Sequence, residues 1–175
     1  EHCGRPTGVM LQVGTRNIQN FELLKKLGRQ QDYLVLLKRG FGIYLTESLN
    51  AAEYLASEGN TSVIFCLRGM KTSLNTPHRN MVDFAHVPVI KRMTRMPVCI
   101  DPSYSVETMA LSSDWIPDIF HATAQGLIAL ANMVPVDFHP NTAEALVDGP
   151  QTLTLDELPP FPGRCGTDPG LSLIH

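Results

Sequence analysis

The stretch TESLNAAEYLASEGNTSVIFCLRG, Thr46–Gly69, combines an amphipathic helix pattern with a strand pattern that follows it directly. Thr46 suits a helix N-cap, Glu47 lies in the expected first turn, and Gly59 suits the position after the helix end. The run Val63–Leu67 is too short for a helix and apolar throughout, as in strands covered on both faces of a parallel sheet. This stretch therefore predicts an α/β protein.

The same alternation of a short apolar run and a longer helical pattern recurs along the chain, giving five units in all. The other four runs are Val9–Val13, Val35–Leu37, Pro97–Ile100 and Met133–Phe138. The last helical pattern before Met133 has Asp114 as its cap and a buried stripe of Ile116, Ile119, Phe120, Thr123, Leu127 and Leu130, with His121 off the stripe. Periodicity alone leaves an open doubly wound sheet and a (β/α) barrel both possible.

The composition is ordinary for a single globular domain: 175 residues, 43% hydrophobic and 18% charged. A net charge of −3 and the lack of a dense basic run argue against nucleic acid as a partner. No apolar run reaches the length of a membrane span, and no leader pattern opens the chain. The cysteines show no paired metal spacing and favour reduced, buried thiols, so we expect a cytoplasmic protein. They are Cys3, Cys66, Cys99 and Cys165.

Polar side chains follow each apolar run. In parallel α/β folds the carboxyl ends of the strands form one face, which carries the active site. The residues expected at that face are Arg16, Lys38, Arg39, Arg68, Asp101, Tyr104, Asp137 and His139. A single basic residue there is more simply a surface charge, but three at successive strand ends favour an anion site.

Strand alternation makes the orientation of these side chains predictable. Asp137 and His139 should point the same way, with Phe138 on the opposite side. Of Lys38 and Arg39, one should face inward and the other should pair on the surface. Beyond the strand, Asn141 and Glu144 fit a capping arrangement that opens a short helix.

Several motifs together resemble 3-deoxy-7-phosphoheptulonate (DAHP) synthase, in the branch that includes the 3-deoxy-octulosonate 8-phosphate synthases. The likeness runs from about residue 10 to 158. The matching segments are MLQVGTRNIQNFELLKKLG, VLLKRG, AAEYLASEGN, VIFCLRGMKT, RNMVDFAHVPVIKRMTRMPVCIDPS and VDFHPNTAEALVDGPQTLTLDEL. The GTRNIQNF element resembles the DAHP rather than the octulosonate enzymes.

The resemblance implies a (β/α)₈ TIM barrel that condenses phosphoenolpyruvate with erythrose 4-phosphate, the first step of the shikimate pathway to chorismate and the aromatic amino acids. It assigns Arg16, Lys38 and Arg68 to phosphoenolpyruvate, with Lys38 and Arg68 also the expected catalytic residues. Converging cations can neutralise and orient the phosphate and carboxylate of this substrate.

The resemblance also implies a divalent metal, Mn²⁺ or a similar ion, that acts as a Lewis acid. Asp137 and Asp148 match the family's two carboxylate ligands, and Tyr104 stands where the family's DPSH motif has histidine. The family's cysteine ligand has no counterpart. Because a neutral phenol is a poor substitute for imidazole, we expect weak metal affinity, and His139 is a lesser candidate ligand.

The chain matches only about five of the eight units, and a closed barrel takes about 250 residues. We expect residues 1–8 to be irregular, residues 9–158 to form the partial barrel, and residues 159–175, rich in proline and glycine, to form an irregular tail. The strands at Val9 and Met133 would expose open edges and favour self-association. Pro135 is awkward inside a strand because it lacks a backbone donor.

Three functions remain open at this point. The first is a DAHP synthase-like condensation. The second is binding of an anion or a partner chain, without turnover, by an impaired partial homologue. The third is that of a full enzyme of which this chain is a portion. The missing cysteine strand and the missing loop for erythrose 4-phosphate favour an inactive chain. Finding both upstream of Glu1 in the encoding DNA would favour the third.

Overall fold

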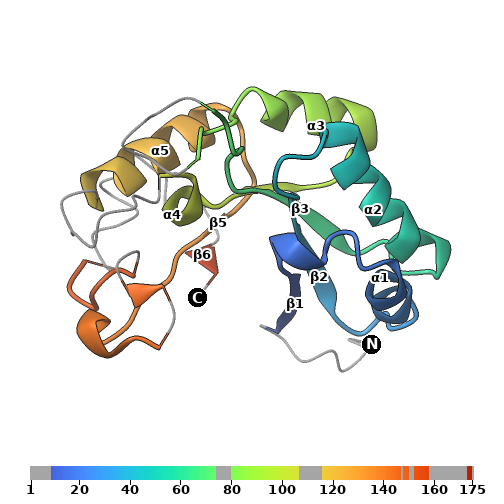
Figure 1. Ribbon diagram of the computed structural model, residues 1–175, viewed down its shortest axis with the longest axis horizontal. Helices are drawn as coiled ribbons and strands as arrows, with labels where there is room; N and C mark the ends of the chain where they lie inside the picture. The colour runs from blue at the N-terminus through green and yellow to red at the C-terminus, as the bar shows by residue number, and fades with distance from the viewer. Residues whose placement is uncertain are drawn as a thin grey trace, which may run out of the picture. The chain divides into compact units, whose positions relative to one another are not determined.

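A computed structural model of the chain describes residues 9–73, 80–106, 116–146, 148–149, 152–157 and 173–174. The chain divides into two compact units, Glu1–Cys66 and Leu67–His175, which are described separately. Figure 1 labels the helices and strands of both.

Unit 1 contains three parallel strands in the order β1-β2-β3. They are β1 (Met10–Val13), β2 (Leu34–Lys38) and β3 (Val63–Leu67), whose last residue begins unit 2. Val13 pairs with Leu37, and Lys38 pairs with Cys66. Most side chains of β2 and β3 are buried, as their continuous apolar sequence predicted. The first three predicted strands are confirmed to within a residue or two at their ends.

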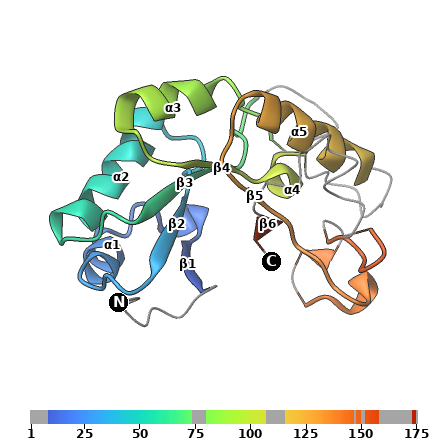
Figure 2. The same ribbon diagram turned by 180° about the vertical axis from the view of Figure 1, so that it is seen from behind.

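Two helices of unit 1 pack against each other: α1 (Phe21–Gly28) and α2 (Leu45–Ser57). Figures 1 and 2 show both on the same side of the strands. Thr46 is not the N-cap of α2. The helix begins at Leu45, so its N-cap is Tyr44 and Thr46 lies inside the first turn. The Tyr44 backbone N–H donates to the Glu47 carboxylate at 2.8 Å, which provides the cap. Gly59 follows the helix with a φ of 108°, as predicted.

The contact between α1 and α2 depends on the absence of a side chain at Gly28. A Cβ there would lie 2.7 Å from the Leu55 carbonyl oxygen and 2.8 Å from the Glu58 Cβ. We expect Gly28→Ala to lower the free energy of unfolding by about 1–3 kcal/mol, the usual effect of overpacking. Urea denaturation followed by circular dichroism measures this. Gly14→Ala is the matched control, since a Cβ there meets nothing within 4 Å; equal stability of the two variants would contradict the expectation.

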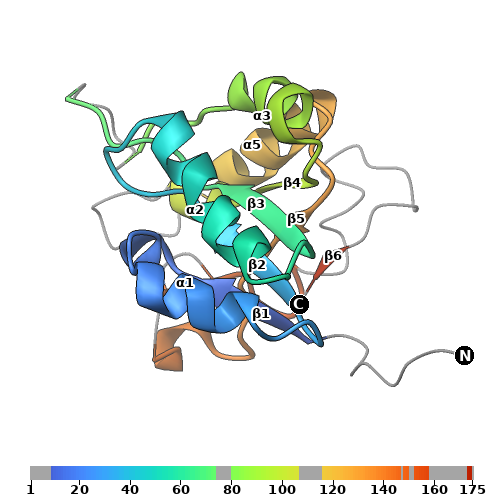
Figure 3. The same cartoon turned by 90° about the vertical axis from the view of Figure 1, so that its right-hand side faces the viewer.

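Apart from the short 3₁₀ helix η1 (Thr15–Asn17) of unit 1, the remaining described elements belong to unit 2. They are α3 (His86–Thr94), β4 (Val98–Ile100), α4 (Pro102–Ser105), α5 (Ile116–Ile128), β5 (Val134–Pro135), the short 3₁₀ helix η3 (Thr142–Glu144) and β6 (Leu173–Ile174). A parallel bridge between Cys99 and Met133 joins the β4 and β5 segments. The fourth predicted strand is confirmed. The fifth is much shorter than predicted, and both Figure 1 and Figure 3 show it between α5 and β6.

Helix α5 supplies one side of the core of unit 2. Ile119, Phe120 and Thr123 are buried, and Leu127 packs against the cluster formed with Val134, Val136 and Leu153. Leu130 is 71% exposed, contrary to the predicted stripe, because the helix ends at Ile128 and Leu130 has a φ of 67°. His121 is exposed, as predicted. The predicted cap Asp114 lies outside the described residues.

Strand β5 does not present the open edge that the sequence suggested. It pairs in parallel with β6, with Val134 opposite Leu173 and Pro135 opposite Ile174. The tail expected to be irregular therefore contains one short strand. Strand β1 pairs only with β2 within the described part of the chain. Pro135 falls at the last residue of β5, so the ladder ends where the missing donor would interrupt it.

Two further expectations concern the chain as a whole. Cys66 and Cys99 are buried, reduced cysteines, as predicted, while Cys3 and Cys165 lie outside the described residues. No helix in the described ranges is long and apolar enough to cross a membrane.

Candidate active site

Unit 1 contributes the first cations expected at the strand ends. Arg16 lies in the short helix η1 (Thr15–Asn17) after β1 and is exposed, whereas Lys38 ends β2 and is 7% exposed. Arg39 is only 4% exposed, so the expectation that one member of this pair lies on the surface is wrong. Its backbone N–H donates to the Cys66 carbonyl at 2.8 Å, which extends the ladder one residue beyond β2 and holds Arg39 inside the fold.

Arg68 directly follows β3, is the second residue of unit 2 and is 4% exposed. The next residue, Gly69, has a φ of 82°, a conformation that side chains with a Cβ rarely adopt. A Cβ at Gly69 would also lie 2.9 Å from the Asn80 Cβ and 3.2 Å from the Ser105 Cα. Glycine therefore allows the turn after β3 to pack closely against α4, and this fixes the backbone that carries Arg68.

A second set of contacts holds α4 beside this turn. The Asp101 backbone N–H donates to the Leu67 carbonyl at 2.7 Å, and the Asp101 carboxylate accepts from the Tyr104 N–H at 3.3 Å. The side-chain amide of Asn80 donates to the Tyr104 carbonyl at 2.8 Å. Sequence reasoning missed Asn80 as a supporting residue. Its only signal was its place in the RN pair that opens one of the segments resembling the family.

Tyr104 connects Arg68 to Asp148. The Arg68 guanidinium carbon lies 4.5 Å from the centre of the Tyr104 ring, a cation–π distance. At the other end of the side chain, the Tyr104 hydroxyl donates a hydrogen bond to the Asp148 carboxylate. These three residues come from different parts of unit 2, and no periodicity in the sequence relates them.

The Tyr104 hydroxyl stays protonated because its surroundings disfavour a phenolate. Burial makes the largest contribution, followed by the hydrogen bond to Asp148 and the negative charges of Asp148, Asp137 and Asp101. Together they raise the pKa of Tyr104 well above its ordinary value. At neutral pH the side chain is therefore a hydrogen-bond donor toward Asp148.

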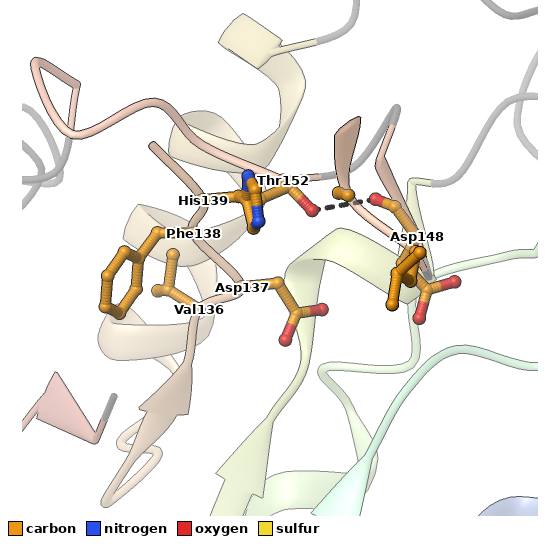
Figure 4. A pocket seen from close by; sticks show the side chains of 8 residues that line it. Val136, Asp137, Phe138, His139, Asp148 and Thr152 are labelled. Carbon is orange, nitrogen blue, oxygen red and sulfur yellow. Dashed lines mark hydrogen bonds between the residues drawn. The ribbon is translucent and has the colours of Figure 1, made fainter. Parts of the chain in front are cut away.

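A pocket of about 410 Å³ lies beside Asp148. Its lining residues are Val136, Asp137, Phe138, His139, Ala145, Leu146, Asp148 and Thr152. Figure 4 shows Asp137 and His139 leaving the chain on one side and Phe138 on the other, which confirms the predicted alternation. Asp148 has a φ of 51°, and its carbonyl accepts from the Thr152 hydroxyl at 2.9 Å. The predicted carboxylates therefore line one pocket.

The segment after Asp137 differs from the predicted capping arrangement. Helix η3 does begin after Asn141, but the Asn141 side chain makes no capping hydrogen bond. Instead, His139 Nδ1 lies 2.7 Å from the Asn141 carbonyl oxygen and 3.1 Å from the Asn141 backbone nitrogen, and the Asn141 carbonyl accepts from the Glu144 N–H at 2.9 Å. Because Nδ1 serves this turn, His139 has a structural role at that nitrogen.

The residues at the predicted metal position do not form a set that fits a divalent ion. Among the described residues there is no group of three or more histidine, cysteine, aspartate or glutamate side chains placed to hold one. Tyr104, expected as the third ligand beside Asp137 and Asp148, keeps its proton and directs it at the Asp148 carboxylate. Carboxylate ligands need their lone pairs directed at the ion, and this hydrogen bond competes for those of Asp148.

Parallel strands followed by helices, with charged side chains just beyond the strand ends, are typical of the parallel α/β class, which includes the (β/α) barrels. The sequence matches the DAHP synthetase I family over residues 7–164. The chain therefore belongs to this family. Its fold is that of the family's TIM barrel, with about five of the eight βα units present.

The chain is 40% identical over 147 residues to a phospho-2-dehydro-3-deoxyheptonate aldolase of Thermotoga maritima, which covers 84% of this chain and 41% of that protein. It is 24% identical over 132 residues to a 2-dehydro-3-deoxyphosphooctonate aldolase of Desulfosudis oleivorans, covering 73% and 46%. The crystal structure of the Thermotoga DAHP synthase matches with a TM-score of 0.77 at 35% identity, over 87% of this chain and 42% of that one. The chain thus spans less than half the length of these relatives.

Proposed function

We propose that this chain carries the phosphoenolpyruvate-binding part of a DAHP synthase-like active site. The complete reaction condenses phosphoenolpyruvate with erythrose 4-phosphate at the entry to the shikimate pathway. Arg16, Lys38 and Arg68 supply the positive charge that receives the phosphate and carboxylate of phosphoenolpyruvate. Family membership and the identity of these three residues support the assignment.

Arg68 is the observation that carries the proposal. Its side chain is 4% exposed at the end of β3, and its backbone is fixed by the Gly69 turn. A buried guanidinium is screened little by solvent, so its positive charge attracts a nearby anion more strongly than an exposed one would. A planar, preorganised fork also matches phosphate and carboxylate geometry better than a mobile ammonium.

A second function, anion binding without turnover, is favoured by one specific contact. The Tyr104 hydroxyl donates to the Asp148 carboxylate. This hydrogen bond engages a carboxylate that, in the family, is a metal ligand. Within the family, that metal polarises the aldehyde of the second substrate or activates water. A chain that binds phosphoenolpyruvate but lacks a metal site would bind the first substrate and stop there.

A turnover assay separates the two functions. We expect the wild-type chain with phosphoenolpyruvate, erythrose 4-phosphate and Mn²⁺ to consume no phosphoenolpyruvate, measured by the loss of its ultraviolet absorbance. We also expect Tyr104→His to remain inactive, because the cysteine ligand and the loop for erythrose 4-phosphate have no counterpart in this sequence. Turnover by the wild type would establish condensation by this chain alone.

The control for this assay is a longer chain. Where the encoding DNA continues upstream with the cysteine strand and the aldose-phosphate loop, that longer product is assayed in parallel. Turnover by the longer product and none by the present chain would assign Arg16, Lys38 and Arg68 to the phosphoenolpyruvate half of a complete enzyme. Strong activity gained by Tyr104→His in the present chain would contradict the proposal that the missing elements are needed.

A further inference from the structure

Tyr104 makes two contacts at once, and each involves a residue with a role in the proposed site. Its ring lies under the Arg68 guanidinium at 4.5 Å, and its hydroxyl donates to Asp148. Its backbone is held on both sides, since the N–H donates to the Asp101 carboxylate and the carbonyl accepts from Asn80. The side chain is therefore fixed in place rather than free to swing out of the site.

We propose that Tyr104 is a positioning residue that stands in for the family's divalent metal. It ties Asp148 and Arg68 together, so that the anion-binding site of unit 2 assembles without a metal ion. This inference rests on the proposed function, because it describes how Arg68 is held for phosphoenolpyruvate. It goes beyond that function by making binding of the first substrate independent of divalent cations.

The chemistry of Tyr104, Asp148 and Arg68 supports the replacement of a divalent ion by the tyrosine. A divalent ion draws carboxylates together because both can direct lone pairs at it, and it repels the proton of a phenol. A tyrosine hydroxyl satisfies one carboxylate through its proton instead and adds no charge. The electron-rich face of the Tyr104 ring attracts the Arg68 guanidinium. A metal ion near the same position would instead repel that guanidinium, because both are positively charged. The arrangement thus favours Arg68 and disfavours a cation beside it.

The first test uses Mn²⁺ alone and needs no substrate. Electron paramagnetic resonance measures free Mn²⁺ as it is titrated into the full chain. We expect the wild type to leave Mn²⁺ free, and Tyr104→His to bind it at least about tenfold more tightly, a typical effect of changing a group around a metal site. The matched control is Tyr44→His, which adds the same imidazole to a side chain that is 79% exposed in unit 1.

The outcomes of this titration are decisive whether or not phosphoenolpyruvate binds. Stoichiometric Mn²⁺ binding by the wild type would overturn the inference, because Tyr104 would then not exclude the ion. Failure of Tyr104→His to gain affinity over both the wild type and the Tyr44→His control would also overturn it. Thermal unfolding of each variant by circular dichroism confirms that the chains compared are folded.

The second test measures phosphoenolpyruvate affinity by calorimetry, with Mn²⁺ and with a chelator. We expect equal affinity of the wild type in both conditions. Tyr104→Leu, which removes the ring, should bind about 3- to 30-fold more weakly, and Tyr104→Phe, which keeps it, should fall between the two. Equal affinity of all three chains, or wild-type binding only with Mn²⁺, would overturn the inference. No binding by the wild type in either condition would instead refute the proposed function, and the Mn²⁺ titration would still decide the role of Tyr104.

Discussion

Replacing Arg68 with alanine is expected to weaken phosphoenolpyruvate binding by about 100-fold or more. The guanidinium is 4% exposed, so its charge meets little solvent screening and acts at close range on a bound anion. Truncating a buried charge also leaves the ligand's own charge desolvated without a partner, which adds to the loss. Calorimetric titration of phosphoenolpyruvate into the wild-type and variant chains measures the ratio of dissociation constants.

Two further variants separate the position of Arg68 from the total charge of the chain. Arg92→Ala, on the exposed side of α3, removes the same charge from the same unit and should change affinity by less than about twofold in buffer of physiological salt. Arg68→Lys keeps the charge but loses the fork and the flat face against Tyr104, so a loss of about tenfold is expected. Equal effects of Arg68→Ala and Arg92→Ala would show that affinity depends on net charge alone.

Phe65→Ala is expected to lower the free energy of unfolding by about 3–5 kcal/mol. Phe65 lies in the middle of β3, is 0% exposed, and is the largest fully buried side chain among the described residues. Its removal deletes a large apolar contact and leaves a cavity that the close-packed strands cannot fill. Because a domain of ordinary size is stable by only about 5–15 kcal/mol, much of the native population would be lost at 37 °C.

Urea denaturation of graded variants tests this expectation. Phe65→Leu keeps most of the buried volume and should cost less than half as much as alanine. Phe21→Ala removes the same ring from a position that is 45% exposed and stacked on Tyr54, and its effect should stay near about 1 kcal/mol. A cost below about 1 kcal/mol for Phe65→Ala would contradict the burial on which the fold description depends.

The strands were predictable where the sequence carries a strong local signal. Val63–Leu67 and its neighbours are continuous apolar runs, and such runs are buried on both faces of a parallel sheet whatever the detail of the packing. The ends of elements were less predictable. Thr46 looked like a cap, but the helix begins at Leu45 and the Glu47 carboxylate accepts from the Tyr44 N–H instead.

Other differences arise from contacts between residues far apart in the sequence. Strand β6 pairs with β5 across nearly forty residues, and nothing in the composition of the tail signals that pairing. Arg39 is buried, and its backbone N–H donates to the carbonyl of Cys66, 27 residues further along the chain. Leu130 fits the helical period but comes after the helix has ended. Periodicity describes neighbours along the chain and carries no information about such contacts.

Some features of the candidate site were also predictable from the sequence, and others were not. Asp137 and Asp148 were predicted from the family pattern, and the structure brings both to one pocket (Figure 4). The change of the family's histidine to Tyr104 was visible in the sequence, and the expectation of weak metal affinity was based on it. The hydrogen bond from Tyr104 to Asp148 and the stacking of Arg68 on the ring were not visible, because both need the geometry of α4.

We propose that the chain binds phosphoenolpyruvate through Arg68 without a divalent metal. Titration of phosphoenolpyruvate into the wild-type chain in the presence of a chelator, followed by calorimetry, tests it most directly. We predict saturable binding at one site per chain, lost in Arg68→Ala and retained in Arg92→Ala. The absence of saturable binding by the folded wild-type chain would contradict the claim.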